Sequence, residues 1–192
     1  METGNWKLGQ LVISMNFDIS LFKTIHGLVG RSICLDSLGI FIAVYLIWFI
    51  PILIFLIWFL NRKKKSSLKA LFLGLLAVIL VYLFDFLIEK IFFRPRPFVS
   101  LNFYPLINIS PQESSFPSTH AALAFALASS VYFINRRLGV IFLVLTLLIG
   151  ISRIFIGVHW PSDILAGAVL GLGCSWMIYK LLLDKLKPIT NN

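Results

Sequence analysis

Charged residues are scarce in this chain of 192 residues, since only 13% are Asp, Glu, Lys or Arg, whereas 59% are hydrophobic. A soluble domain has about 25% charged and roughly 45–50% apolar residues. A chain this short could not bury so large an apolar excess in a core surrounded by water. The composition therefore excludes an ordinary soluble domain and predicts one compact bundle that faces lipid.

Cysteine and acidic residues are also few. Cys34 and Cys174 are the only cysteines, and they lack the spacing of zinc ligands, so we expect two small buried residues without a disulfide. Eight acidic residues stand against 17 Lys and Arg. The basic residues lie in short stretches between apolar runs, which is typical of membrane orientation signals and argues against a nucleic-acid partner. The first ten residues also lack the pattern of a cleavable signal peptide.

Five apolar segments are candidates to span a membrane, a task that needs about 20 mostly apolar residues each. They are 37–60, 68–88, 119–135, 138–157 and 161–183. Before them, apolar residues recur at helical spacing from Leu21 to Val29, after Asp18 as a candidate N-cap. We expect this amphipathic helix to lie flat in the membrane interface, with a re-entrant segment as the alternative.

The predicted fold is therefore an all-α, polytopic membrane bundle of about five transmembrane helices plus an N-terminal interfacial helix. We expect a single domain, 1–192, with the interfacial segment at 1–36 and the bundle at 37–186. Five spans place 61–67, the turn at 136–137 and the C-terminus on one side. That side carries ten of the 17 basic residues and only one acid, Asp184, which predicts that it is cytoplasmic and that loop 98–117 faces outward.

Polar residues gather in three short clusters at the outer ends of four consecutive spans. Cluster 94–97 closes the second span, cluster 117–120 opens the third, and the last cluster runs from Ser152 to Asp163 between the fourth and fifth. Polar residues inside a membrane are costly and usually functional. Because consecutive spans alternate in direction, we expect all three clusters to meet in one site at the outer face.

The side chains of these clusters suit the transfer of a phosphoryl group. Arg96 and Arg153 offer planar forks of donors that match phosphate oxygens. His159 and His120 can act as nucleophile and as acid or base. Asp163 falls in the first turn of the last helix, from which its carboxylate can reach back and orient His159.

Neutral donors complete the predicted anion site, because Ser118 and the amide of Thr119 lie at a helix N-terminus. Candidates for the edge of the site are Lys90, Ser152, Arg94 and Glu89. For Arg94, contact with a headgroup or a loop is favoured over contact with phosphate. Asp163 is the only acid in the three clusters, whereas Mg²⁺ usually takes carboxylate ligands, so we expect no metal and no cofactor.

In order and spacing, the clusters resemble the motifs of the type 2 phosphatidic acid phosphatase superfamily, which read Lys-x6-Arg-Pro, Pro-Ser-Gly-His and Ser-Arg-x5-His-x3-Asp. This sequence has Arg96-Pro97, then Pro117-Ser118-Thr119-His120, then Ser152-Arg153, His159 and Asp163. Stretches within 17–37 and the run 96–99 are similar to the bacitracin-resistance branch, whose members are undecaprenyl-diphosphatases. The resemblance covers about 16–186.

Two positions depart from the family pattern. Glu89 stands where the family has lysine, seven positions before Arg96, and Lys90 follows one residue later, about 100° further around a helix. Thr119 replaces a glycine, and its β-branched side chain restricts the backbone near the phosphate. The bacitracin-resistance branch tolerates loss of the lysine. We expect Glu89 to pair with Lys90, Arg94 or Arg96 and not to touch phosphate.

The resemblance implies hydrolysis in two steps, in which His159 attacks phosphorus and His120 first protonates the leaving oxygen and then activates water. The expected reaction converts undecaprenyl diphosphate to the monophosphate and phosphate at the outer face of a bacterial plasma membrane. The expected partners are this lipid diphosphate and membrane lipids. Phosphatidic acid and phosphatidylglycerophosphate are alternative substrates. The alternative from another class is a catalytically inactive protein that binds or transports lipid phosphates.

Overall fold

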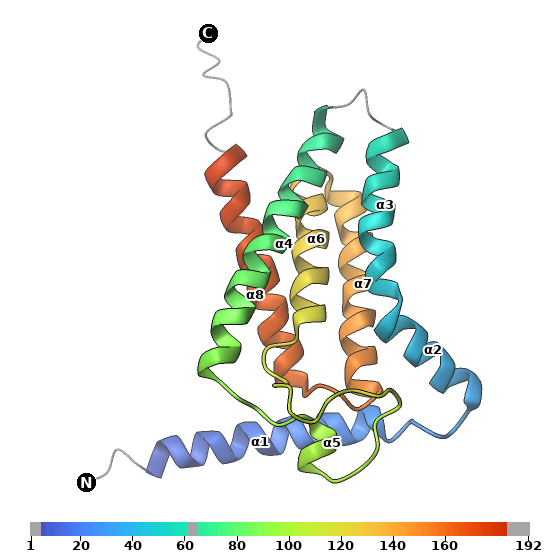
Figure 1. Ribbon diagram of the computed structural model, residues 1–192, viewed down its shortest axis with the longest axis vertical. Helices are drawn as coiled ribbons and strands as arrows, with labels where there is room; N and C mark the ends of the chain where they lie inside the picture. Colours follow the sequence, from blue (N-terminus) through green and yellow to red (C-terminus); the bar gives the residue numbers. More distant parts are fainter. Residues whose placement is uncertain (1–4, 61–64, 184–192) are drawn as a thin grey trace.

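A computed structural model describes residues 5–60 and 65–183, and over these ranges the chain forms eight helices and no strand. The helices are α1 (Asn5–His26), α2 (Ile33–Val44), α3 (Leu46–Leu60), α4 (Lys65–Ile91), α5 (Pro97–Ser100), α6 (Thr119–Ile134), α7 (Arg136–Phe155) and α8 (Pro161–Leu183). Helices α3, α4, α6, α7 and α8 run side by side, and α1 lies across one end of this bundle (Figure 1).

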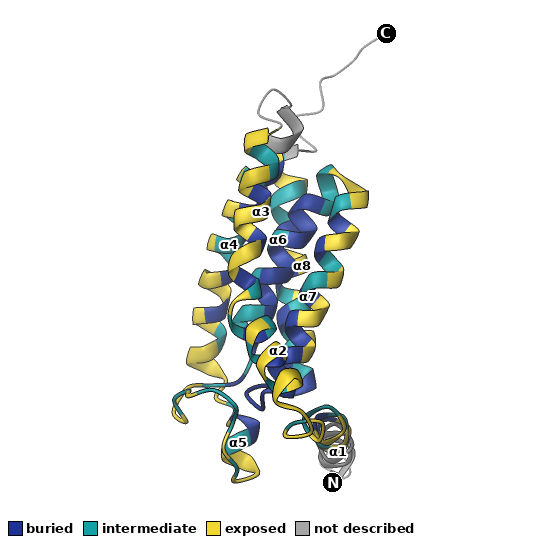
Figure 2. Ribbon diagram, turned by 90° about the vertical axis from the view of Figure 1, so that its right-hand side faces the viewer, coloured by how far each residue is buried: buried dark blue, intermediate teal, exposed yellow. Residues whose placement is uncertain are grey.

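Helix α6 forms the centre of the bundle, and nearly every residue from Ala121 to Val131 is buried (Figure 2). Its small side chains allow α8 to approach closely. A Cβ atom on Gly167 would lie 2.5 Å from the carbonyl oxygen of Ser118, and one on Gly171 would lie 2.2 Å from that of Ala122. Two glycines four residues apart are a known device for close packing of membrane helices. This packing sets the start of α6 against the start of α8.

The prediction of an all-α membrane bundle is confirmed. Among the described residues, three helical segments are long and apolar enough to cross a membrane, namely Leu68–Ile91, Arg136–Phe155 and Pro161–Leu182. The pair α2 and α3 makes a fourth if it counts as one bent span. The remaining predicted span corresponds to α6, whose 16 residues are fewer than a span usually needs. Because α6 is enclosed by other helices, its surroundings are mainly protein.

The first predicted span, 37–60, is not one straight helix. The chain bends by 53° between α2 and α3, and α2 begins at Ile33, four residues earlier than expected. Pro51 lies in the first half of α3, where it cannot donate a hydrogen bond to the carbonyl of Ile47 and its ring crowds that turn. A helix commonly bends just before such a proline, and here the break falls at Tyr45.

Helix α1 runs across the end of the bundle instead of entering it, which favours the interfacial placement over the re-entrant one (Figure 1). The prediction that Asp18 caps this helix is wrong, since α1 begins at Asn5 and Asp18 lies inside it. The expectation of a buried Cys34 is also wrong, because its side chain is exposed, whereas Cys174 is buried. The predicted C-terminal boundary at residue 186 lies outside the described residues.

Candidate active site

The three polar clusters meet at the end of the bundle over which α1 lies, as the topology predicted. Arg96 precedes α5, Arg153 lies in the last turn of α7, and His159 lies in the short connection to α8. Atom Nε2 of His159 is 3.4 Å from Nη1 of Arg96 and 3.3 Å from Nη2 of Arg153. Arg96 and Arg153, which lie 63 and 6 positions before His159 in the sequence, thus converge on one ring nitrogen.

The ring of His159 is held by its other nitrogen. Atom Nδ1 lies 2.9 Å from the carbonyl oxygen of Ser115, whereas Oδ2 of Asp163 is 3.7 Å away. Because a carbonyl oxygen can only accept a hydrogen bond, the proton of the neutral ring is on Nδ1. The Nε2 lone pair therefore faces the two arginines. This differs from the prediction, in which Asp163 alone held the tautomer.

His159 is only 3% exposed, and its surroundings favour the neutral ring. Burial lowers the pKa of His159 well below its usual value, and the charges of Arg153 and Arg96 lower it further. The hydrogen bond to the Ser115 carbonyl acts in the opposite direction but is weaker. At neutral pH the ring is therefore uncharged, as a nucleophile must be.

Asp163 reaches back to the residues before α8, as its position in the first turn predicted. Its Oδ2 atom accepts a hydrogen bond of 2.8 Å from the backbone nitrogen of Trp160. Its Oδ1 atom lies 2.6 Å from Nη1 of Arg94. The carboxylate is fully buried and is therefore fixed by these two partners beside His159.

Three buried donors of the site have no hydrogen-bond partner within the described part of the chain. They are the hydroxyl of Ser118 and the Nε atoms of Arg96 and Arg153. Ser118 occupies the N-cap of α6, yet its hydroxyl caps none of the helix amides. An unpartnered buried donor costs about 1–3 kcal/mol, so three of them around one histidine indicate a site shaped for an anion.

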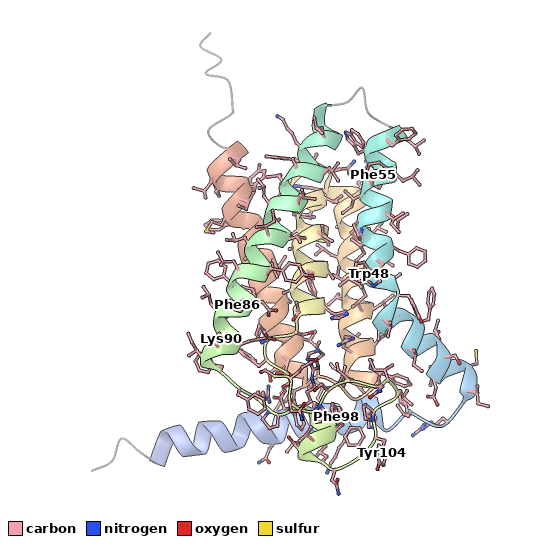
Figure 3. All side chains as sticks on the ribbon, viewed as in Figure 1. Trp48, Phe55, Phe86, Lys90, Phe98 and Tyr104 are labelled. Carbon is pink, nitrogen blue, oxygen red and sulfur yellow. The ribbon has the colours of Figure 1, made fainter. Side chains whose placement is uncertain are left out.

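A cavity of about 770 Å³ opens from this site. Its polar end is lined by Arg96, Pro117, Thr119, His120, Arg153 and His159. Polar residues of α4 and of the loop before α6 also line it, namely Glu89, Lys90, Gln112, Glu113 and Ser114. The rest of the lining is largely apolar side chains of α3, α4 and α6, including Ile47, Trp48, Pro51, Leu75, Val78, Tyr82, Phe86, Leu123 and Leu127. Trp48 and Phe86 project from α3 and α4 in the half of the bundle nearer the site (Figure 3). The cavity thus offers an anion site joined to an apolar wall.

The remaining predicted site residues take different positions. His120 is half-buried in the first turn of α6 and lines the cavity. The hydroxyl of Thr119 donates to Oδ2 of Asp85 at 2.8 Å, so this departure from the family glycine links α6 to α4. Ser152 is buried in the last turns of α7 and lies outside the cavity lining.

The candidates for the edge of the site divide into two groups. Glu89 and Lys90 line the cavity, and Nζ of Lys90 lies 5.3 Å from the ring centre of Phe86. The predicted ion pair of Glu89 is wrong, because Glu89 makes no such contact with any described residue. Arg94 binds Asp18 and Asp163, and Arg96 binds Glu113. Arg94 lies outside the cavity lining, so its direct contact with phosphate is not supported.

Three contributors were missed from the sequence. Ser115 acts through its backbone carbonyl, which no side-chain motif reveals. Glu113 is 58% exposed and places Oε2 at 3.3 Å from Nη2 of Arg96. Asp18 joins the site from α1, 76 positions before Arg94, so only the folded chain could reveal it. Within the described ranges, no three His, Cys, Asp or Glu side chains are grouped as metal ligands would be.

Comparisons with known proteins give a consistent result. The chain is 33% identical over 179 residues to "Undecaprenyl-diphosphatase BcrC" of Bacillus subtilis, and this alignment covers 92% of this chain and 89% of that protein. It is 32% identical over 161 residues to "Putative undecaprenyl-diphosphatase YbjG" of Escherichia coli, covering 83% of this chain and 80% of that protein.

Two crystal structures share the fold. LpxE of Aquifex aeolicus aligns with a TM-score of 0.70 and 26% identity, covering 84% of this chain and 94% of that one. A phosphatidylglycerolphosphate phosphatase of Bacillus subtilis aligns with a TM-score of 0.69 and 25% identity, covering 92% of this chain and 89% of that one.

The family described as the PAP2 superfamily matches residues 70–187, which hold every predicted catalytic and phosphate-binding residue. The chain therefore belongs to the PAP2 superfamily.

Proposed function

We propose that this protein is a membrane phosphatase that hydrolyses undecaprenyl diphosphate, or a closely similar polyprenyl diphosphate, through a phosphohistidine. The observation that carries the proposal is the set of unpartnered buried donors around His159, on Ser118, Arg96 and Arg153. Arg96 and Arg153 line the polar end of a cavity that continues along apolar side chains of α3, α4 and α6, and Ser118 lies between the lining residues Pro117 and Thr119. Relatives named undecaprenyl-diphosphatase over most of the chain support the same substrate class.

In the first step, Nε2 of His159 attacks the terminal phosphorus, and the bond from phosphorus to the leaving oxygen breaks. Arg96, Arg153 and Ser118 donate to the phosphoryl oxygens, where negative charge must be held in the transition state. His120 gives its proton to the leaving oxygen of the polyprenyl monophosphate. The Ser115 carbonyl keeps the proton of the neutral His159 ring on Nδ1, so the attacking lone pair lies on Nε2.

In the second step, water cleaves the phosphohistidine. His120, now neutral, takes a proton from the water as the new bond from oxygen to phosphorus forms. The bond between Nε2 and phosphorus breaks, and inorganic phosphate leaves. The same residue acts first as acid and then as base, as microscopic reversibility requires.

The apolar walls suit the chain of a lipid substrate. The lining side chains of α3 and α4 include Trp48, Tyr82 and Phe86, each with more than half of its surface exposed. In a membrane, such exposed apolar surface faces lipid, so a polyprenyl chain can lie along it while its diphosphate reaches Arg96 and Arg153. We place the site at the extracytoplasmic face, because Arg136 and Arg137, at the start of α7, lie at the opposite end of the bundle.

Purified protein in detergent provides the test, with phosphate release measured from polyprenyl diphosphate, phosphatidylglycerophosphate and phosphatidic acid. We expect the diphosphate to have the highest kcat/KM. A preference for phosphatidylglycerophosphate would support the alternative substrate, and no release from any lipid would support an inactive binding protein.

Two further measurements test the chemistry. With substrate labelled in the terminal phosphate, rapid acid-free quenching should trap label on the protein, and His159→Ala should carry none. Activity should survive excess EDTA and fall with vanadate, which can mimic five-coordinate phosphorus. Loss of activity in EDTA that Mg²⁺ restores would contradict the metal-free mechanism.

A further inference from the structure

Three charged side chains form a chain of ion pairs behind His159. Atom Nη1 of Arg94 lies 2.6 Å from Oδ1 of Asp163, and Nη2 lies 2.6 Å from Oδ2 of Asp18. Asp163 is fully buried and Asp18 is 4% exposed. The three side chains come from different parts of the chain, and none of them lines the cavity. Their role is therefore not direct contact with a ligand in that cavity.

Hydrogen bonds around this triad fix α1 against the start of α8. Oδ1 of Asp18 accepts from the backbone nitrogen of Ser162 at 2.9 Å, and Oδ2 accepts from the Ser162 hydroxyl at 2.5 Å. The guanidinium of Arg94 also lies 5.4 Å from the ring centre of Trp160. A planar group with two bound carboxylates has little freedom to turn. Arg94 therefore holds Asp163 in a fixed position beside His159.

The charges of the triad do not cancel. Asp18 and Asp163 each carry one negative charge and Arg94 carries one positive charge, so the triad is net negative. When a neutral His159 forms a bond to phosphorus while keeping its Nδ1 proton, its ring becomes positively charged. Oδ2 of Asp163 lies 3.7 Å from Nδ1 of His159. The net negative triad therefore stabilises the ring cation and hence the transition state leading to it.

We propose that Asp18 and Arg94 are positioning residues of the His159–Asp163 pair, and that Asp18 keeps the charge behind His159 negative. This inference rests on the proposed function, since it assigns the triad to the step in which His159 is phosphorylated. It makes α1 a part of the active site and not only a membrane anchor.

Other contacts keep α1 in place independently of the Asp18 charge. The ring of Phe22 packs 5.4 Å from that of Trp160, and Nδ1 of His26 lies 2.7 Å from the carbonyl oxygen of Phe155. The amide oxygen of an asparagine can still accept from Arg94 and from the Ser162 hydroxyl, so only the bond from the Ser162 backbone nitrogen is lost. Asp18→Asn should therefore remove the charge while leaving α1 docked.

The test compares Asp18→Asn with the matched variant Asp36→Asn. The carboxylate of Asp36 accepts from the backbone nitrogen of Gly30 at 3.1–3.2 Å and makes no contact with the triad. We expect Asp18→Asn to lower kcat roughly three- to tenfold, the size expected for one partly screened charge. KM and the unfolding temperature in detergent should change little, and Asp36→Asn should change neither kcat nor KM.

The pH profile separates this role from a structural one. Removing a negative charge disfavours the protonated ring of His159, so the acid limb of kcat/KM should move to lower pH in Asp18→Asn. The charged or titratable groups near the ring, Arg96, Arg153, His120 and Asp163, stay the same in this variant, as does Glu113 beside Arg96. Arg94→Lys keeps the charge but has no second arm for Asp18, so its kcat should fall further.

Equal kcat values and acid limbs in Asp18→Asn and Asp36→Asn would overturn the inference. So would a lower kcat in Asp18→Asn that comes with a lower unfolding temperature and an unmoved acid limb. Failure of the proposed function has a different result, namely no phosphate released by the unmodified protein. The two variants would then be compared by vanadate binding to purified protein, where equal affinities would again count against the triad.

Discussion

The carbonyl oxygen of Ser115 lies 2.9 Å from Nδ1 of His159, 0.8 Å closer than the nearest carboxylate oxygen of Asp163, which is 3.7 Å away. The backbone of the loop before α6 therefore sets the tautomer of the candidate nucleophile. In a serine protease triad the carboxylate has this task, and its replacement by an amide costs about 10⁴ in kcat through the wrong tautomer. In this protein the Ser115 carbonyl holds the tautomer, so replacing the Asp163 carboxylate by an amide should lower kcat by less than that factor.

Asp163→Asn should therefore retain measurable activity. We expect kcat to fall about 10- to 100-fold, because the proton stays on Nδ1, hydrogen-bonded to the Ser115 carbonyl, while the negative charge beside the ring is lost. His159→Ala should show no turnover above background. Parallel measurement of kcat on purified samples, with matched unfolding temperatures, makes the comparison. If both variants were equally inactive while folded, Asp163 and not Ser115 would control the ring.

The pH dependence of kcat/KM should follow the His159 ring. Burial and the two arginines lower its pKa well below the usual value near 6.5, so the ring stays neutral and nucleophilic as pH falls below that value. Protonation removes the lone pair, so the loss of activity that His159 causes lies on the acid side of that lowered pKa. The acid limb of a profile measured between pH 4 and 8 should therefore lie well below 6.5. A limb at or above 6.5 would mean that the ring is not buried as described.

The sequence predicted the parts of the fold that depend on local pattern and topology. Apolar runs separated by basic loops predicted the membrane bundle, and alternation of the spans placed Arg96, His120 and His159 at the same end. The bend between α2 and α3 was missed, although Pro51 was visible in the sequence. A single proline does not show at which residue the helix before it bends, because the position of the bend depends on how the helix packs.

The contacts within the site were harder to predict than its residues. The spacing of His159 and Asp163 suggested a direct hydrogen bond, yet the nearer acceptor is a backbone carbonyl that has no sequence signature. Asp18 was interpreted as a cap because it precedes an apolar pattern, but the helix continues on its N-terminal side. Its true partner, Arg94, depends on how α1 crosses the bundle, and no periodicity encodes this.

The orientation in the membrane can be tested by labelling single cysteines in intact cells. The background is Cys34→Ser, because Cys34 is exposed at the site end of the bundle and would react, whereas Cys174 is buried. Asn108→Cys, on the exposed loop at the site end, should react with an impermeant maleimide. Arg137→Cys, at the exposed start of α7, should react only after the cells are opened. The reverse pattern would place the site in the cytoplasm.

Glu113→Gln should tighten substrate binding. The carboxylate of Glu113 lies 3.3 Å from Nη2 of Arg96 and competes with phosphate for that donor. Since the side chain is 58% exposed, its pair with arginine is worth at most about 1 kcal/mol, a factor of roughly five. KM should therefore fall up to fivefold with little change in kcat. Gln112→Ala, on the neighbouring cavity-lining residue, serves as the control, and a raised KM in Glu113→Gln would show that this carboxylate assists binding.

Glu89 stands where the family has lysine, and the structure leaves it exposed in the cavity lining without an ion pair to any described residue. Its charge acts on the phosphate through water, so the effect should be modest and should weaken with salt, given a Debye length of about 8 Å at physiological ionic strength. Glu89→Gln should lower KM about two- to threefold and leave kcat unchanged, and Glu89→Lys should lower KM further. Lys90→Gln, on the adjacent lining residue, should change KM in the opposite direction. Measurement of KM at 0.05 M and 0.5 M salt distinguishes this long-range effect from direct contact. If Glu89→Lys instead raised kcat severalfold at both salt concentrations, a lysine at this position would reach the phosphate, and Glu89 would occupy a true phosphate-binding position.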